Sequence, residues 1–464
     1  MKKKSQSSTF PGFKRGLGAG LAGLRAGGAL LADSLYSKAT GGDAGQSDFV
    51  KREAERFVIE LGRMKGSYIK IGQLMALLGE HFLPPALVTA LRNLHDATEP
   101  VPIDTLGSVL ASVDHLNELE IDQQPLAAAS LSQVHRAKII ASDDSLVLKI
   151  QYPHLAATVD EDFDTVVKML QVARWLTPGR DLERWLSTLR TQLHLEMDYQ
   201  READYTSRMA IIAASDQSEY ANLCVPHVYP RFSSNCVLAL SYHSGFAVDH
   251  KTVQSLSLAR RNALAQAMLE LFFKELYVWG IMQTDPNLGN YLIAPRPRGD
   301  SGEKDTLVLL DFGSSVEFSD EFLSALGKTI AAGQRQSRDE LIEGLVALGC
   351  LQSDAHADAK NSFADFCLLL LEPLRPQADL PAQYVDEKGL YRWAESQLIA
   401  RVAQQARASV KNRHFASPTQ EFAVIARKLM GVFTFICLLN PRFNGHTIAQ
   451  TYIERWQASA NASR

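Results

Sequence analysis

Two short polar segments in the second half of the chain carry side chains suited to holding a metal ion against phosphates. The first, "QTDPNLGN", places Asp285 five positions before Asn290, and the second, "LLDFGSS", places Asp311 directly after an apolar run. Carboxylate and amide oxygens are hard ligands that Mg²⁺ prefers, and Mg²⁺ neutralises the β and γ phosphates of ATP. A short hairpin between the segments brings them side by side. The pattern predicts ATP and Mg²⁺ as cofactors, with Asn290 and Asp311 as metal ligands.

Protein kinases show the same spacing, with an Asp in the catalytic loop, an Asn five residues later and a DFG motif downstream. They also hold the α and β phosphates with a strand Lys that an acid from a helix orients. Lys149 lies in the strand-like run "LVLKIQ", and Glu202 in "EMDYQREADY" is the best candidate for the acid. Either residue alone is more often simply solvated. The ordered set is what favours a nucleotide site.

The glycine-rich loop of ordinary kinases is replaced by the alanine-rich segment "PLAAASLSQVHRA". Alanine lacks the freedom of glycine at positive φ, so this loop is not expected to fold flexibly over phosphates. We nevertheless expect its residues to approach the nucleotide: Ala127, Ala128, Ala129, Ser130, Ser132 and Gln133. No APE motif follows Asp311, so there is no long activation segment on which a protein substrate could dock.

Hydrophobic periodicity predicts a two-lobed α+β protein. Apolar residues three and four apart predict helices before the sheet region, with a break at the Pro-Pro pair that begins at Pro84. The runs "LSQVHRAKII" and "LVLKIQ" predict a hairpin, and "VYPRF" and "CVLALSY" predict two further strands. Four regions result: 1–48, a basic Gly/Ala-rich segment; 49–115, a helical extension; 116–245, a lobe with the sheet and a helical insertion; and 246–464, a helical lobe with the two polar loops.

Composition narrows the class of protein. The formal net charge of -4 over 464 residues gives no reason to expect nucleic acid as a partner. Five scattered Cys without a CxxC pair indicate a reducing compartment, and no His/Cys cluster has the spacing of a zinc site. Apolar runs such as "GVFTFICLL" are shorter than the roughly 20 residues of a membrane span, so no transmembrane helix is predicted. The basic N-terminus is either a targeting or membrane-surface segment or a disordered tail.

At this point the sequence resembles the UbiB family, also called aarF-domain-containing kinases, which are atypical members of the protein-kinase-like superfamily linked to ubiquinone biosynthesis. The resemblance covers about residues 50–455 and rests on motifs in a fixed order. These are "KIGQ" (the KxGQ motif, Lys70 to Gln73), "AAASLSQVHRA", the acids Glu196 and Asp198 of an ExD motif, "QTDPNLGN" and "LDFG".

The resemblance implies a kinase-like fold whose N-terminal KxGQ helices lie across the place where a protein substrate would bind. It implies that Lys70 reaches toward the nucleotide site, with Glu196 and Asp198 as acidic neighbours, and Gln73 shares its helix face. It further implies Asp285 as the proton acceptor. Three positions depart from the family pattern, namely Ser132, the pair Asn287 and Leu288, and the hinge residues Leu240 and Ser241.

Three hypotheses for function follow. The first is an ATP-dependent phosphotransferase or ATPase that supports ubiquinone biosynthesis at a membrane surface, acting on or with a lipid-like or quinone-precursor-like molecule and possibly with other enzymes of that pathway. The second is a nucleotide-binding scaffold or lipid-extracting module without phosphoryl transfer. An ordinary Ser/Thr kinase is disfavoured by the missing glycine loop and APE motif. The expected location is the cytoplasm, peripheral to the membrane, in a bacterium, or the matrix side in a mitochondrion.

Overall fold

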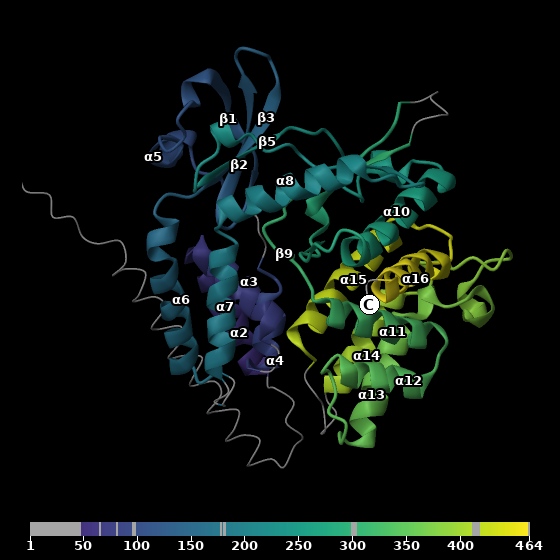
Figure 1. Ribbon diagram of the computed structural model, residues 1–464. Helices are drawn as coiled ribbons and strands as arrows, with labels where there is room; N and C mark the ends of the chain where they lie inside the picture. Colours follow the sequence, from purple (N-terminus) through teal and green to yellow (C-terminus); the bar gives the residue numbers. More distant parts are fainter. Residues whose placement is uncertain are drawn as a thin grey trace, which may run out of the picture. The chain divides into compact units, whose positions relative to one another are not determined.

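The computed structural model describes residues 48–64, 66–79, 82–94, 99–176, 179, 182–297, 304–410 and 418–462 (Figure 1). The chain forms two compact units. Unit 1 comprises Met1–Ala203 and Val228–Tyr242, and unit 2 comprises Asp204–His227 and His243–Arg464. Apart from its last residue, the basic segment 1–48 lies outside the described residues. Both interpretations of this segment, as a targeting or membrane-surface segment and as a disordered tail, therefore stay predictions.

Most helices of unit 1 pack around one hydrophobic core. The helices are α2 (Asp48–Met64), α3 (Ser67–Leu78), α4 (Pro85–Leu91), α5 (Gly107–Leu110), α6 (Leu155–Val172) and α7 (Leu182–Leu195), and α8 (Tyr199–Ser215) begins in this unit. Of these, α5 packs against the sheet of the same unit instead. Phe57, Val58 and Leu61 of α2 recur at helical spacing and are buried. The same core takes in α3, α4, α6 and α7. The predicted extension and the predicted insertion therefore share one core.

Gly66 separates α2 from α3. Its φ of 61° lies in the left-handed region, which glycine adopts without the strain of a side chain. The apolar periodicity continues across this position and predicts one helix, but a residue in this conformation ends the helix and turns the chain. The KIGQ motif consequently sits on the separate, mostly apolar helix α3.

Unit 1 also contains a four-stranded antiparallel sheet in the order β1-β2-β3-β5. Its strands are β1 (Leu119–Ala128), β2 (Ser132–Ile139), β3 (Ser145–Gln151) and β5 (Val237–Ser241). Leu146, Leu148 and Ile150 of β3 are fully buried on one face. Because side chains alternate along a strand, Lys149 points to the opposite face.

One predicted strand of the sheet is wrong. The segment "VYPRF" forms only a single bridge, between Val228 and Leu240, followed by a 3-10 turn at Pro230–Phe232. Proline has no N–H to donate to a strand ladder, and its fixed φ suits the first position of a helical turn. The turn packs Phe232 into the apolar face of the sheet.

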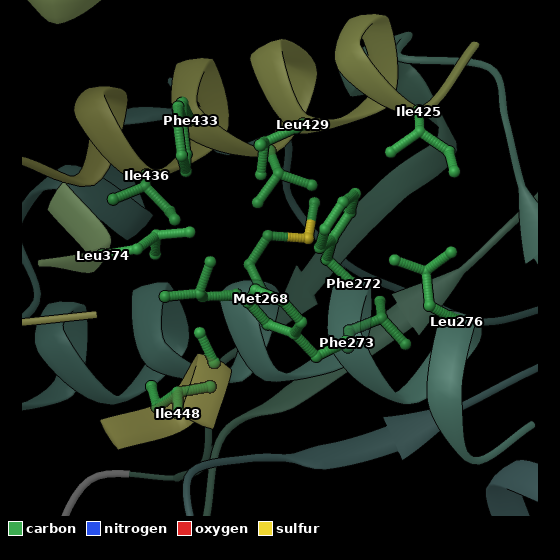
Figure 2. Close-up of a cluster of buried hydrophobic side chains, with 14 of the residues drawn as sticks. Met268, Phe272, Phe273, Leu276, Leu374, Ile425, Leu429, Phe433, Ile436 and Ile448 are labelled. Atoms are coloured by element: carbon green, nitrogen blue, oxygen red, sulfur yellow. The ribbon is translucent and has the colours of Figure 1, made fainter. Parts of the chain in front are cut away.

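Unit 2 is mostly helical. Its helices are α9 (Lys251–Gln254), α10 (Leu258–Tyr277), α11 (Asp320–Gln334), α12 (Arg338–Ala347), α13 (Ala357–Leu370), α14 (Leu398–Val410), α15 (Gln420–Leu439) and α16 (His446–Ala462). The short strands are β4 (Asn222–Cys224), β6 (Met282–Gln283), β7 (Tyr291–Ala294), β8 (Thr306–Leu309) and β9 (Ser315–Val316). Figure 2 shows the core between α10 and α15, where Met268 and Phe272 meet Leu429 and Phe433. This core supports the β6–β7 segment.

Helix α15 is longer than the apolar run "GVFTFICLL" suggests. It has 20 residues, with a mean hydropathy of 2.0 over its most apolar window, and by length and composition alone it could cross a membrane. The helix extends N-terminally of this run through residues 420–430, whereas the prediction that the chain has no transmembrane helix stays a prediction. Half of that window is buried inside the protein.

Candidate functional site

The two polar loops of unit 2 are bound to each other by backbone hydrogen bonds on both sides. Antiparallel pairing of β7 with β8 places Tyr291, which directly follows the first loop, opposite Leu309 at the end of β8. Next to this pair, the Leu310 N–H donates to the carbonyl oxygen of Asn290 at 2.8 Å. On the other side β6 pairs with β9, and the hydroxyl of Thr284 donates to the carbonyl of Ser314 at 2.6 Å. These ladders fix the separation of the loops through the main chain.

Asp285 and Asn290 meet directly. The side-chain amide of Asn290 donates to the Asp285 carboxylate at 2.9 Å, and the other carboxylate oxygen accepts the Asn287 N–H at 3.2 Å. The Asn287 side chain in turn caps the short turn by accepting from Gly289 N–H at 2.9 Å. The five-residue spacing is thus the length of one capped turn. Asn290 is buried and Asp285 is half-buried.

Asp311 has an unusual backbone conformation. Its φ of 57° is left-handed, which is uncommon for a residue other than glycine, and such strain occurs where the surrounding structure enforces it. Its carboxylate accepts the N–H of Gly313 at 3.2 Å. Phe312 is buried in the core of unit 2 and anchors the loop. The strand pairing beside Asn290 places Asp311 next to the first loop.

In unit 1 the Lys149 ammonium is bound by both oxygens of Glu202, at 2.8 and 2.9 Å. The Glu202 side chain is only 3% exposed, whereas that of Lys149 is 20% exposed. The ammonium also lies 5.3 Å from the centre of the Tyr199 ring, within the range of a cation–π contact. The predicted strand lysine and helix acid are therefore brought together, and the lysine retains a side open to solvent.

Lys70 of the KIGQ motif forms an ion pair with Glu196, with 2.8 Å between Nζ and Oε2. Asp198 has a different position, because its carboxylate accepts the N–H of Arg201 at 3.0 Å at the start of α8. It acts as the N-cap of the helix that carries Glu202. The structure thus brings Glu196 to Lys70 and uses Asp198 to hold the neighbouring helix.

The other two motif residues of α3 pack against the chain that follows α4. A Cβ on Gly72 would lie 2.5 Å from Leu94 and 2.8 Å from Leu61, so only glycine fits there without displacement. The amide of Gln73 donates to the Leu94 carbonyl at 3.2 Å. Lys70 and Gln73 therefore have different partners, although they lie one turn apart.

The alanine-rich segment is held closely. Ala127 and Ala128 belong to β1 and pair with Val134 and Gln133, and the Ala129 N–H donates to the Ser132 carbonyl at 2.8 Å. The predicted hairpin loop is thus shorter than expected, because the alanines continue the strand. Leu131 packs into the helical core of unit 1, which anchors the turn.

Three polar side chains of this segment are buried. Ser130 and Ser132 are 3% and 5% exposed, and Gln133 is not exposed at all. The Gln133 amide accepts from Val101 N–H at 3.0 Å and donates to the Val101 carbonyl at 2.9 Å. Since both ends of its amide are occupied in the interior, we omit Gln133 from the nucleotide-binding set.

A profile of the ABC1 atypical kinase-like domain matches residues 95–344, more than half of the chain. The chain belongs to this family. The ABC1 domain is the core of the UbiB proteins, so the resemblance predicted from the motifs is confirmed. The matched range contains the Lys149–Glu202 pair and both polar loops of unit 2.

Relatives of this ABC1 chain span several kingdoms. "Atypical kinase COQ8, mitochondrial" of Schizosaccharomyces pombe is 28% identical over 396 residues, covering 84% of this chain and 61% of the relative. The protein of the same name in Saccharomyces cerevisiae is 27% identical, with 82% and 72% covered. The Dictyostelium discoideum "Probable serine/threonine-protein kinase abkA" is 27% identical, with 96% and 78% covered. The chain thus spans less than two thirds of the fission-yeast relative's length.

A solved structure supports the fold. The Rv3197 protein of Mycobacterium tuberculosis, in complex with erythromycin, superposes with a TM-score of 0.59 at 21% identity and covers 88% of this chain and 97% of its own. The predicted two-lobed α+β kinase-like fold with a helical extension is confirmed. At this identity the likeness concerns the fold alone.

The donor set of the ABC1 chain fits Mg²⁺ better than a transition metal. Asp311 and Asn290 provide carboxylate and amide oxygens, and no cluster of three or more His, Cys, Asp or Glu occurs among the described residues. Mg²⁺ is commonly held by one or two protein oxygens while substrate phosphates and water complete its shell. All five cysteines are thiols.

Sequence reasoning missed several supporting residues of the site. Thr284 and Ser314 bind the two loops together, Tyr199 flanks Lys149, and Asn287 caps the Asp285–Asn290 turn. The Asn-x-Gly pattern of residues 287–289 is a turn signal that could have revealed the cap. The Thr284–Ser314 bond has no comparable signal, because it depends on how two strands pair.

Proposed function

We propose that this chain binds Mg-ATP and acts as an atypical kinase or ATPase that supports ubiquinone biosynthesis at a membrane surface. The observation that carries the proposal is the clamped pair of loops in unit 2. Main-chain ladders on both sides place Asp285, Asn290 and Asp311 together, and a loop without chemical work needs no such arrangement. Membership of the ABC1 family agrees with this assignment.

The residues of the candidate site would have different roles in nucleotide binding and phosphoryl transfer. Asn290 and Asp311 would hold Mg²⁺, which neutralises phosphate charge when bound. Asp285 would accept a proton from the attacking hydroxyl or orient water. Lys149, oriented by Glu202, would bind the α and β phosphates. Main-chain groups of the segment 127–130, with the side chain of Ser132, would approach the nucleotide.

Lys70 would restrain the nucleotide with its point charge, with Glu196 as its counter-ion. The Ala-rich turn is bound into the core of unit 1 and cannot open and close as a glycine loop does. A chain with a fixed turn and no APE motif is better suited to a small acceptor than to a protein segment. We therefore propose a lipid-like or quinone-precursor-like molecule as the substrate or effector.

The relatives named COQ8 are mitochondrial, which supports a mitochondrial location if the source is eukaryotic. We propose the matrix side in that case, and the cytoplasm, peripheral to the membrane, if the source is bacterial. Enzymes of ubiquinone biosynthesis are then natural partners. The near-neutral charge balance does not favour nucleic acid.

Magnesium-dependent ATP hydrolysis by the full chain tests this function, with and without vesicles that contain anionic lipid. We expect hydrolysis that requires Mg²⁺ and rises with vesicles. Asp285→Asn should abolish it, whereas Asp339→Asn, a change of the same chemistry at an exposed site on α12, should not. Magnesium-dependent nucleotide binding without hydrolysis under all conditions would instead support the scaffold or lipid-extracting alternative.

A further inference from the structure

A buried lysine lies beneath the Asp285–Asn290 turn. Lys428 of α15 is 1% exposed, and its Nζ donates to Gln283 Oε1 at 2.8 Å and to the Tyr291 hydroxyl at 2.6 Å. The Tyr291 hydroxyl also donates to Gln283 Oε1 at 3.1 Å. Gln283 immediately precedes the segment 284–290, and Tyr291 immediately follows it. One ammonium therefore joins both ends of the turn.

The counter-ion comes from a second helix. Glu275 of α10 is 2% exposed, and its Oε2 lies 3.4 Å from Lys428 Nζ. Burial raises the pKa of Glu275 to about 7, although the Lys428 ammonium opposes this shift. Burial also acts against the charge on Lys428, but Glu275 and Tyr291 outweigh it and the pKa of Lys428 is raised. The lysine therefore stays charged at neutral pH.

Helix α15 meets the same turn at a second position. A Cβ on Gly431 would lie 2.6 Å from the Cβ and 3.0 Å from the Cα of Pro286, so the proline sits against the bare helix backbone. Lys428 and Gly431 are three residues apart and share one face of the helix. Through Lys428 this helix face contacts Gln283 and Tyr291, which flank the turn, and through Gly431 it contacts Pro286 within the turn.

We propose that Lys428 is a positioning residue, which sets the placement of Asp285 and Asn290 by fixing Gln283 and Tyr291 at the two ends of their turn. The proposal rests on the proposed function, since it assigns Lys428 to the same site without contact to the nucleotide. A buried ion pair is often no more stabilising than apolar residues of similar volume. The ammonium instead provides directional contacts, because it binds the side chains of Gln283 and Tyr291 and faces the Glu275 carboxylate.

The test uses a charge-neutral double variant, Lys428→Met with Glu275→Gln, which removes the tie without leaving an unpaired buried charge. Its matched control is Lys274→Met with Asp216→Asn. Lys274 is also a buried lysine of unit 2, and its Nζ binds Asp216 Oδ2 at 2.7 Å and lies 3.4 Å from Glu270, rather than contacting the turn. Both double variants remove a buried lysine and one of its carboxylate partners, and in the control the remaining carboxylate, Glu270, keeps the hydrogen bonds from the hydroxyls of Ser218 and Tyr452.

Two readouts are compared in folded protein. Hydrogen exchange of the amides of 284–290, without nucleotide, should become about fivefold faster or more in the Lys428 variant and stay unchanged in the control. The turnover number should fall by about tenfold or more with little change in KM, because misplacement of a catalytic group by about 1 Å has effects of this order. Gly431→Ala should also lower turnover by pushing on Pro286.

The outcomes separate the two proposals. If the parent hydrolyses ATP and the Lys428 variant matches it in turnover and in exchange, Lys428 is merely structural and the inference is wrong. If the parent shows no magnesium-dependent nucleotide chemistry, the proposed function fails. The exchange measurement then still decides whether Lys428 holds the turn.

Discussion

The candidate site residues of unit 1 and those of unit 2 are held in place by different means. In unit 2, strand pairing on both sides of the polar loops fixes Asp285, Asn290 and Asp311 through the main chain. In unit 1, Lys149 and Lys70 are fixed by side-chain ion pairs with Glu202 and Glu196. Main-chain hydrogen bonds do not require particular side chains on the paired residues, whereas an ion pair is lost when either of its two side chains is replaced. Each of these two lysines of unit 1 can therefore lose its carboxylate partner through a single substitution.

The largest effect is expected at the clamped turn. Asp285→Asn keeps the side-chain volume but removes the proton acceptor, so hydrolysis should fall by about a hundredfold or more. Magnesium-dependent nucleotide binding should change little, because the proposed metal ligands remain. Steady-state kinetics and a nucleotide titration check the two halves of this expectation. Unchanged hydrolysis would remove Asp285 from the mechanism.

Glu202→Ala should show how strongly unit 1 depends on its ion pair. The change leaves the Lys149 ammonium without its carboxylate partner, and breaking a mostly buried pair costs on the order of 3 kcal/mol of unfolding free energy. Chemical denaturation of the variant measures this cost. Glu317→Ala, at an exposed pair with Arg208 in unit 2, is the control and should cost less than about 1 kcal/mol. Equal costs would contradict the burial argument.

The buried acid of unit 2 predicts a pH dependence of stability. Glu275 has a folded pKa of about 7 against 4.5 in the unfolded chain, so between these values the folded state holds the additional proton. Stability from this group is therefore greatest at low pH and decreases as the pH rises toward 7. Relative to the parent, the Lys428→Met, Glu275→Gln variant should gain on the order of 3 kcal/mol between pH 4.5 and 7.5. Denaturation curves over this range that remain parallel for the two proteins would contradict the assignment.

A smaller effect is expected at the KIGQ motif. Lys70→Ala should change nucleotide affinity or turnover by about tenfold, equivalent to about 1.4 kcal/mol. The unfolding free energy should fall by no more than about 1 kcal/mol, because the Lys70–Glu196 pair is partly exposed. Binding and hydrolysis that both match the parent in a folded variant would return Lys70 to a structural role.

Local patterns predicted the parts of the site that depend on neighbours in sequence. The five-residue spacing of Asp285 and Asn290 and the strand that carries Lys149 are of this kind, and both appear as expected in the structure. The alanine-rich hairpin was misjudged, because the pairing of Ala127 and Ala128 depends on where β2 begins. The break at Gly66 was also missed, since apolar periodicity continues through it.

Contacts between distant parts of the chain could not be predicted from one sequence. Lys428 lies 137 residues from Tyr291 and reads as an ordinary polar residue of a helix. Gln133 was expected to approach the nucleotide, but its side-chain amide is hydrogen-bonded to the backbone of Val101. In both cases the role of a polar side chain depends on which hydrogen-bond partner the fold places beside it.

The most direct test of the central claim is the magnesium dependence of nucleotide binding in Asp311→Asn, measured by thermal shift over a nucleotide titration. The variant loses a charged hard ligand but keeps its shape, and Asp339→Asn serves as the control. We predict a magnesium-dependent rise in melting temperature for the parent and the control, and none for Asp311→Asn. The same magnesium-dependent rise in all three proteins would contradict the assignment of Asp311 as a metal ligand, and with it the proposed site.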